Sequence, residues 1–309
     1  MLKGSIVALV TPFNNDGSIN YDKLKELLLM HEKNSDGILI LGTTAEAEVL
    51  NYEEKIEVVK FSRNIVKNKP LVVGAGSNNT KESIKMAYEF SKLGADYLLT
   101  ITPYYNKTND LGLIKHFEAI ADASSVPLIL YNVPSRTGMN ISIDVIEKLY
   151  KNPKIYGIKE ASGNMSYAMK LIKYLSDDFI MLSGNDDLIV PMISIGGSGV
   201  ISVLANIAPI NTKKICDEAF KKDYKKASLL QSKLLRFTNL LFSEVNPIPI
   251  KEAMNYFNYN VGGYRLPLTN MSEDKKHILI EEMDKNKELI KWKYVLLDMV
   301  KWAKLFMIS

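Results

Sequence analysis

Residues 127–159 read PLILYNVPSRTGMNISIDVIEKLYKNPKIYGIK and contain the repeating unit of the chain. Two short apolar runs, 127–131 and 155–159, flank a stretch over 142–151 that has the amphipathic spacing of a helix. Continuous apolarity, rather than in-out alternation, is typical of a strand that is covered on both faces. The stretch therefore predicts a strand, a helix and a second strand parallel to the first.

The same unit recurs along the first two-thirds of the chain. Further apolar runs lie at 5–10, 37–41, 71–74, 97–101, 179–183 and 199–203. Helical patterns lie around 24–31 and over 53–67, 80–93, 111–123, 165–176, 187–195 and 209–221. Eight strand–helix units predict an α/β protein with a closed (β/α)8 TIM barrel. The alternative, an open doubly wound sheet, would usually carry a glycine fingerprint after its first strand, and Thr11-Pro12-Phe13 is not one.

The strand signals stop after residue 222. Helical patterns continue around 227–241 and over 249–258, 272–285 and 288–307. We therefore predict a barrel over 1–222 and a C-terminal helical region over 223–309.

The composition limits the possible partners. The net charge of +4, from 39 basic and 35 acidic residues, is too small to indicate a nucleic-acid-binding protein. A single cysteine, Cys216, excludes an intrachain disulfide framework and fits a reducing compartment. The N-terminus lacks the apolar run of a signal peptide, and no segment reaches the roughly 18 apolar residues of a membrane span. We expect a cytoplasmic protein with no nucleic-acid partner and no membrane partner.

The functional side chains of such a barrel lie where its strands end, because eight loops converge there. Lys159 closes the run 155–159, where an apolar residue would serve packing. Burial disfavours the charged form of a lysine, and a neutral amine can attack a ketone to form a Schiff base. The alternative is that Lys159 pairs with Glu160 or reaches solvent at the rim.

Other polar residues follow neighbouring strands. Tyr131 could relay protons with a hydroxyl such as that of Thr44, or it could be a rim aromatic packed under a loop. Thr43 and Thr44 could offer N–H groups and hydroxyls to a carboxylate, or form a plain helix N-cap with Glu46 in the first turn. Arg136 suits bidentate capture of a carboxylate, with a surface arginine as the alternative.

Several segments at the strand ends and in the tail carry a resemblance through their order and spacing. They are Gly42-Thr43-Thr44, Thr102-Pro103-Tyr104-Tyr105-Asn106, 131–138 (YNVPSRTG), 157–163 (GIKEASG), 183–187 (SGNDD), 199–203 (GVISV), 246–249 (NPIP) and 265–268 (RLPL). Together, over about 4–271, they resemble the dihydrodipicolinate synthase / N-acetylneuraminate lyase family. Its members are pyruvate-dependent (β/α)8 enzymes similar to class I aldolases.

The resemblance implies a role for several of these residues. Lys159 would form the Schiff base with pyruvate. Tyr131, Thr44 and Tyr105 would form a proton relay, with Tyr105 lent across a subunit interface. Thr43 and Thr44 would hold the carboxylate of pyruvate.

The resemblance also implies the second substrate site and the assembly. Arg136 would bind the carboxylate of the second substrate, and Gly184 and Val203 would line the pocket. We expect no cofactor, no metal, and a homo-oligomer that is at least a dimer and, by the resemblance, a dimer of dimers.

Two features favour the synthase branch of the family over the sialic acid lyases: the arginine within 131–138 and the run 160–163 after Lys159. The implied reaction condenses pyruvate with L-aspartate 4-semialdehyde to 4-hydroxy-tetrahydrodipicolinate, in lysine (diaminopimelate) biosynthesis. Two alternatives stay open. One is another pyruvate Schiff-base aldolase, acting on N-acetylneuraminate or a keto-sugar acid. The other is a non-catalytic binding descendant, for which Ala45 is the only support.

Two departures from the family pattern carry expectations. Ala45 stands where the family usually has glycine, and it would be strained if the position needs a positive φ.

The second departure concerns a possible allosteric lysine site, to which Asn78, Glu82 and Tyr104 look like matches. Tyr52 and Lys55 stand where lysine-sensitive members commonly place histidines. A fixed positive charge disfavours a cationic ligand, so we expect weak or absent inhibition by lysine.

The remaining features carry structural expectations. The last twenty or so residues exceed the usual family length and form a basic amphipathic pattern, which could lie on a membrane but is expected to pack on its own protein or at an interface. Cys216 is expected to pack as a small hydrophobe. His31, His116 and His277 show no metal-ligand spacing; two lie on helical patterns and are expected to be solvated or half-buried.

Overall fold

The computed structural model describes residues 2–290. Its centre is a closed barrel whose eight strands pair in chain order, with β8 closing parallel onto β1. The strands are β1 (Gly4–Ala8), β2 (Gly37–Ile40), β3 (Leu71–Gly74), β4 (Tyr97–Ile101), β5 (Leu128–Asn132), β6 (Ile155–Glu160), β7 (Ile180–Ser183) and β8 (Gly199–Ser202). The predicted (β/α)8 barrel is confirmed, and every predicted run matches its strand to within two residues at each end.

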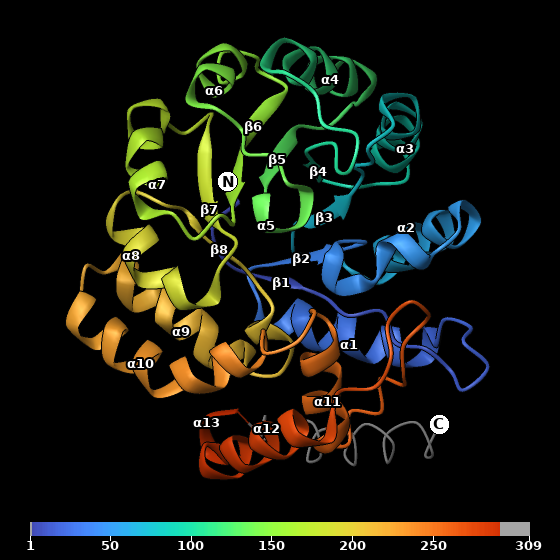
Figure 1. Ribbon diagram of the computed structural model, residues 1–309, viewed down its shortest axis with the longest axis vertical. Helices are drawn as coiled ribbons and strands as arrows, with labels where there is room; N and C mark the ends of the chain where they lie inside the picture. The colour runs from blue at the N-terminus through green and yellow to red at the C-terminus, as the bar shows by residue number, and fades with distance from the viewer. Residues whose placement is uncertain (1, 291–309) are drawn as a thin grey trace.

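Helices surround the barrel on the outside (Figure 1). They are α1 (Tyr21–Asn34), α2 (Tyr52–Ile65), α3 (Thr80–Lys92), α4 (Asp110–Ala123), α6 (Ile143–Leu149), α7 (Met165–Leu171), α8 (Ile189–Ser194) and α9 (Pro209–Phe220). Three short helices lie in the loops that follow β2 and β5: η1 (Thr43–Ala45), η2 (Ala47–Val49) and α5 (Pro134–Thr137). These short helices carry the threonines and the arginine that the sequence placed at the strand ends.

The barrel has an apolar interior separate from the layer between its strands and helices. Ile129 and Tyr131 of β5 belong to the interior layer. In the register between β5 and β6, Ile129 lies opposite Gly157 and Tyr131 opposite Lys159. Because alternate residues of a strand face the same side, Lys159 lies on the interior face of β6.

The chain continues after the barrel as helices α10 (Tyr224–Leu240), α11 (Ile248–Tyr256), α12 (Glu273–Lys285) and α13 (Lys287–Ile290). Helix α10 packs along α9, and α11 packs against α12, below α1 in the view of Figure 1. A domain boundary at residue 222 stays a prediction. The residues that carry the predicted basic amphipathic pattern of the tail, 291–307, lie outside the described residues. Within residues 2–290, no helix is both long enough and apolar enough to cross a membrane.

Two of the three histidines are buried, so the expectation that they are solvated or half-buried was wrong. His31 on α1 shares a hydrogen bond with the Ser35 hydroxyl, and His116 on α4 shares one with the Thr80 hydroxyl. Burial lowers the pKa of His31 to about 3 and that of His116 to about 4. In both histidines, one ring nitrogen hydrogen-bonds a nearby hydroxyl while the rest of the ring packs in the core. Cys216 is buried on α9, as predicted.

Candidate active site

Lys159 projects from the carboxyl end of β6 into the barrel and is 6% exposed. Its Nζ lies 4.2 Å from the centroid of the Tyr131 ring. Its neighbour Glu160 faces the other way and accepts hydrogen bonds from the Asn132 amide and from the backbone N–H of Ser162. Both alternatives considered for Lys159, pairing with Glu160 and exposure at the rim, are therefore wrong.

Gly184 gives the stem of Lys159 its space. A Cβ at position 184 would lie 3.1 Å from Cε of Lys159 and 2.4 Å from Cβ of Ala161. The second distance is too short for any real pair of carbon atoms, so this position at the end of β7 requires glycine. The structure thus brings Gly184 together with Lys159.

Asp186 is a buried carboxylate beside this lysine that the sequence reasoning did not assign. It accepts hydrogen bonds from the backbone N–H groups of Val203 and Leu204, at 2.9 Å each, and from the Ser202 hydroxyl, at 2.5 Å. Burial raises the pKa of Asp186, while these hydrogen bonds and the charge of Lys159 oppose that shift. Asp186 therefore fixes the backbone at Val203, and the acidic pair directly after β7 was the available signal.

The loop after β2 carries Thr43 and Thr44 on the short helix η1, between Gly42 and Glu46. No side chain caps this helix, so the N-cap alternative for the threonines was wrong. The Thr44 hydroxyl accepts a hydrogen bond of 2.9 Å from the side-chain amide of Asn246. Because a hydroxyl can accept and donate at once, the Thr44 proton stays available for a further acceptor.

The strain expected at Ala45 is not there. Ala45 lies inside η1, and the left-handed backbone falls on its neighbours Leu41 (φ 53°) and Glu46 (φ 54°). The Ala45 carbonyl accepts a hydrogen bond from the Thr11 hydroxyl at 2.7 Å. Alanine at this position costs the loop no backbone strain.

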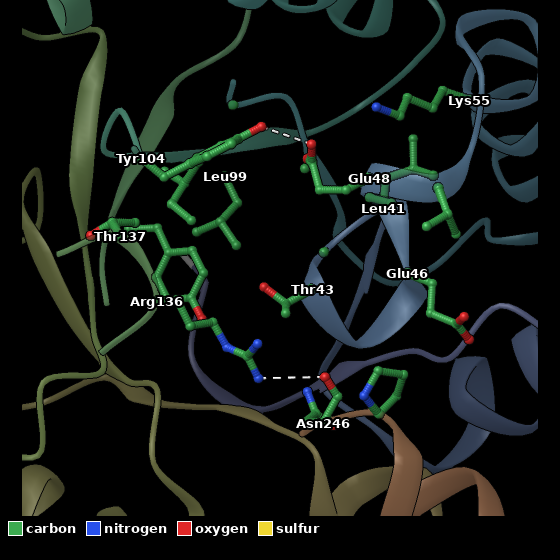
Figure 2. A pocket seen from close by; sticks show the side chains of 18 of the residues that line it. Leu41, Thr43, Glu46, Glu48, Lys55, Leu99, Tyr104, Arg136, Thr137 and Asn246 are labelled. Carbon is green, nitrogen blue, oxygen red and sulfur yellow. Dashed lines mark hydrogen bonds between the residues drawn. The ribbon is translucent and has the colours of Figure 1, made fainter. Parts of the chain in front are cut away.

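A cavity of about 300 Å³ opens beside this loop, and Thr43, Tyr131 and Arg136 line it (Figure 2). Tyr131 connects the cavity with Lys159, since it lines the first and lies against the second. Arg136 comes from α5, directly after β5, and donates a hydrogen bond of 3.4 Å to the Asn246 carbonyl. Its remaining guanidinium donors can serve an anion in the cavity.

Tyr105 does not lie in this cavity. It follows β4, is 88% exposed and has a φ of 66°, in the left-handed region that few tyrosines adopt. Within this chain it does not reach Tyr131 and Thr44 as part of one hydrogen-bonded group.

Of the residues matched to a lysine site, Tyr104 lines the same cavity. The Asn78 side chain donates to the Tyr104 carbonyl at 3.2 Å, and the Tyr104 hydroxyl donates to Glu48 at 2.7 Å (Figure 2). Lys55 lines the cavity together with Glu48 and Tyr104, whereas Glu82 lies on α3. Glu48 is a carboxylate that the sequence reasoning missed there.

Tyr52 is covered by another cation. The Nζ of Lys85 lies 3.6 Å from the centroid of the Tyr52 ring. Lysine-sensitive members commonly have a histidine at this position. Here it is a tyrosine, and the Lys85 ammonium covers one face of its ring.

Three residues from the C-terminal region complete the site, and the sequence reasoning assigned none of them a role. Asn246 bonds Thr44, Lys251 bonds Glu46, and Arg265 bonds Glu54 on α2. Burial lowers the pKa of Lys251, and the Glu46 carboxylate opposes that shift. Asn246 and Arg265 stand in the segments 246–249 and 265–268 that carry the resemblance, whereas Lys251 lies in neither.

Among residues 2–290, no three His, Cys, Asp or Glu side chains come close enough together to hold a metal ion. The chemistry available to the described side chains is that of a buried amine, hydroxyls, an arginine and the buried carboxyls of Glu160 and Asp186.

Comparison with known proteins places this arrangement in a family. Residues 1–285 match the model of the "Dihydrodipicolinate synthetase family". The 4-hydroxy-tetrahydrodipicolinate synthase of Clostridium perfringens (strain SM101 / Type A) is 50% identical over 293 residues, which cover 94% of this chain and 100% of that protein.

Solved structures agree with the sequence match. The dihydrodipicolinate synthase of Acinetobacter baumannii complexed with pyruvate has a TM-score of 0.90 at 39% identity and covers 94% of this chain and 100% of its own. The enzyme of Cyanidioschyzon merolae with lysine bound has a TM-score of 0.89 at 34% identity, covering 92% of this chain and 97% of its own. With a buried lysine facing Tyr131 at the centre of the barrel and a family match along nearly its whole length, the chain belongs to the dihydrodipicolinate synthetase family.

Proposed function

We propose that the chain condenses pyruvate with L-aspartate 4-semialdehyde to give 4-hydroxy-tetrahydrodipicolinate, a step of lysine (diaminopimelate) biosynthesis. The observation that carries this proposal is the burial of Lys159 at the end of β6, with its Nζ 4.2 Å from the centre of the Tyr131 ring. Relatives that bear the name of this activity match the chain over 94% of its length.

The chemistry follows from a buried amine. The Nζ of Lys159 adds to the ketone carbon of pyruvate, and water leaves as the C=N bond forms. The imine withdraws electrons, so the pyruvate methyl group loses a proton and an enamine forms. The enamine carbon bonds to the aldehyde carbon of the second substrate, whose oxygen takes up a proton. The amino group of that substrate then attacks the imine carbon, closes the ring and releases Lys159.

Each of these steps moves a proton, and Tyr131 and Thr44 are the proposed carriers. Asn246 holds the oxygen of Thr44 and leaves its proton to donate. Tyr105, which is exposed in one chain, would complete the relay in a second copy. We therefore propose an assembly of at least two chains and, following the family resemblance, a dimer of dimers that works in the cytoplasm.

The substrate carboxylates have separate proposed partners. Thr43 and Thr44 would hold the carboxylate of pyruvate through the hydroxyls and N–H groups at η1. Arg136 would bind the carboxylate of the second substrate. Gly184 and Val203 would line the pocket on either side of the imine.

The test is turnover by the purified chain. Supplied with pyruvate and L-aspartate 4-semialdehyde, it should consume both, and Lys159→Ala should lose this activity. Supplied with N-acetylneuraminate, it should release no pyruvate above background. Cleavage of N-acetylneuraminate without consumption of the semialdehyde would instead establish the lyase activity, and inactivity with both would contradict the proposal.

A further inference from the structure

The loop that carries Thr43 and Thr44 is bent into an unfavourable shape at both ends. Leu41 and Glu46 bracket it, and both have a positive φ, of 53° and 54°. Neither is glycine, and such residues rarely adopt this region. A conformation of this kind persists only where the surrounding contacts over-determine it. The question is therefore what holds Leu41 and Glu46 in place.

Leu41 is accommodated by its neighbour on β3. A Cβ at Gly74 would lie 1.9 Å from the Leu41 carbonyl oxygen, so the glycine lets the Leu41 backbone come this close. The glycine permits the bend at Leu41 but supplies no interaction that holds it.

Glu46 is held by a full set of polar contacts. Its Oε1 accepts from Nζ of Lys251 at 2.8 Å, and its Oε2 accepts from the backbone N–H of Arg265 at 3.3 Å. Lys251 also donates to the carbonyls of Thr11, at 3.1 Å, and Gly263. An ammonium group has three protons to donate, so Lys251 uses all of them here.

The pair lies entirely inside the protein. The side chains of Lys251 and Glu46 are 0% and 1% exposed. The Nζ of Lys251 also lies 4.4 Å from the centre of the Phe13 ring. Figure 2 shows Thr43 and Glu46 pointing in different directions from the same loop, so the carboxylate is free to anchor the loop while the threonine faces the cavity.

A buried ion pair is a poor means of gaining stability, because removing two charges from water costs about what their attraction returns. What it does supply is a fixed geometry, since each charge tolerates few other positions once buried. Here it joins α11 to a loop 205 residues earlier in the chain. Asn246 adds a second bond between the same two regions, to Thr44.

We infer that the Lys251–Glu46 pair positions the loop of Thr43 and Thr44 for the carboxylate of pyruvate, an inference that rests on the proposed function of that loop. The Glu46 carboxylate and the Lys251 ammonium are engaged with each other and with backbone groups. Lys251 and Glu46 are positioning residues. Through Lys251, the C-terminal region holds the loop that would bind pyruvate.

The experiment compares Glu46→Gln, Lys251→Met and the double variant with the parent chain. Loosening the loop weakens the binding of pyruvate, so KM for pyruvate should rise about tenfold or more. Because Thr44 on this loop is also a proposed proton carrier, kcat should fall as well. KM for the semialdehyde should change much less, since Arg136 lies on α5 after another strand. The double variant buries no unpaired charge and so tests the geometry with the least risk to folding.

Lys276→Met is the matched control. It removes an ion pair of 3.2 Å between Lys276 on α12 and Glu252, the residue after Lys251, and should leave both KM values unchanged. Folding of every variant is checked by circular dichroism. An unchanged KM for pyruvate in the folded double variant would overturn the inference. So would loss of the fold in all three variants, because the pair would then support the barrel rather than the loop.

A second readout separates this inference from the proposed function. Borohydride trapping of the imine needs pyruvate alone, and the pyruvate concentration for half-maximal trapping should rise in the same variants. If the parent chain traps pyruvate but does not consume the semialdehyde, the proposed reaction fails while the positioning role is still measured.

Discussion

Lys159 can extend into the barrel because position 184 has no side chain. The lysine stem passes 3.1 Å from where a Cβ of residue 184 would lie, and its amine ends beside Tyr131. Asp186, two residues on, fixes the backbone of Val203. The amine is thus placed by packing and by neighbouring backbone, in addition to its own strand.

Gly184→Ala tests this placement. The added methyl group would overlap Cβ of Ala161 and press on Cε of Lys159, so the amine should shift from the carbon it attacks. We expect kcat to fall by about tenfold or more, with the fold retained. Steady-state rates and circular dichroism measure the two effects, and a variant with the parent kcat would show that the lysine stem has room to spare.

At the scale of elements, the barrel could be predicted from sequence and its C-terminal contribution could not. Strands buried on both faces are continuous apolar runs, which is why 71–74 and 97–101 were predicted to the residue. Lys251 and Arg265, by contrast, are polar residues in a helix and a loop, and the sequence reasoning gave them no role. Their placement follows from contacts with residues 205 and 211 positions away, and no local pattern carries that information.

The candidate site residues could be chosen from the sequence only where they follow a predicted strand. Lys159, Tyr131 and Thr44 stand at strand ends, where topology alone brings residues together. The backbone of the loop was not predictable, because a positive φ at Glu46 instead of Ala45 depends on the partner that holds the Glu46 carboxylate.

Lys55 on α2 and Glu48 on η2 bear on regulation by lysine. Lys55 on α2 brings a fixed positive charge to the cavity wall, and the carboxylate of Glu48 is already engaged by the Tyr104 hydroxyl. A cationic ligand is disfavoured there. We expect inhibition by lysine to be weak or absent, as initial rates across a lysine titration would show.

Lys55→His removes the fixed charge and should increase sensitivity to lysine. Lys60→His is the control on the same helix, since Lys60 pairs with the exposed Glu57 and should change nothing. Half-inhibition of the parent chain by sub-millimolar lysine would contradict this prediction.

For the whole molecule, the buried histidines contribute to the loss of stability in acid. The pKa of His31 is lowered to about 3 and that of His116 to about 4, both by burial. Each ring stays neutral in the folded chain while the unfolded chain binds a proton below about pH 6.5. Stability is therefore unaffected above that pH and falls as the pH drops toward the folded pKa, by up to about 1.4 kcal/mol per pH unit for each histidine.

In His31→Gln, the unfolding free energy should fall less steeply with decreasing pH, because unfolding then takes up about one proton fewer. His277→Gln is the control, because His277 is 76% exposed on α12 and its side chain pairs with Glu281. Denaturant unfolding between pH 4 and pH 7 gives the slopes. Equal slopes for the parent chain and His31→Gln would mean that His31 takes up its proton while the chain is folded.

The most direct test of the whole account is to trap the imine. The chain is incubated with pyruvate, reduced with borohydride, digested and analysed by mass spectrometry. The account predicts a reduced pyruvate adduct on Lys159, dependent on pyruvate and lost in Lys159→Ala. An adduct on Lys251, which is also buried, or no adduct under conditions that support turnover, would contradict it.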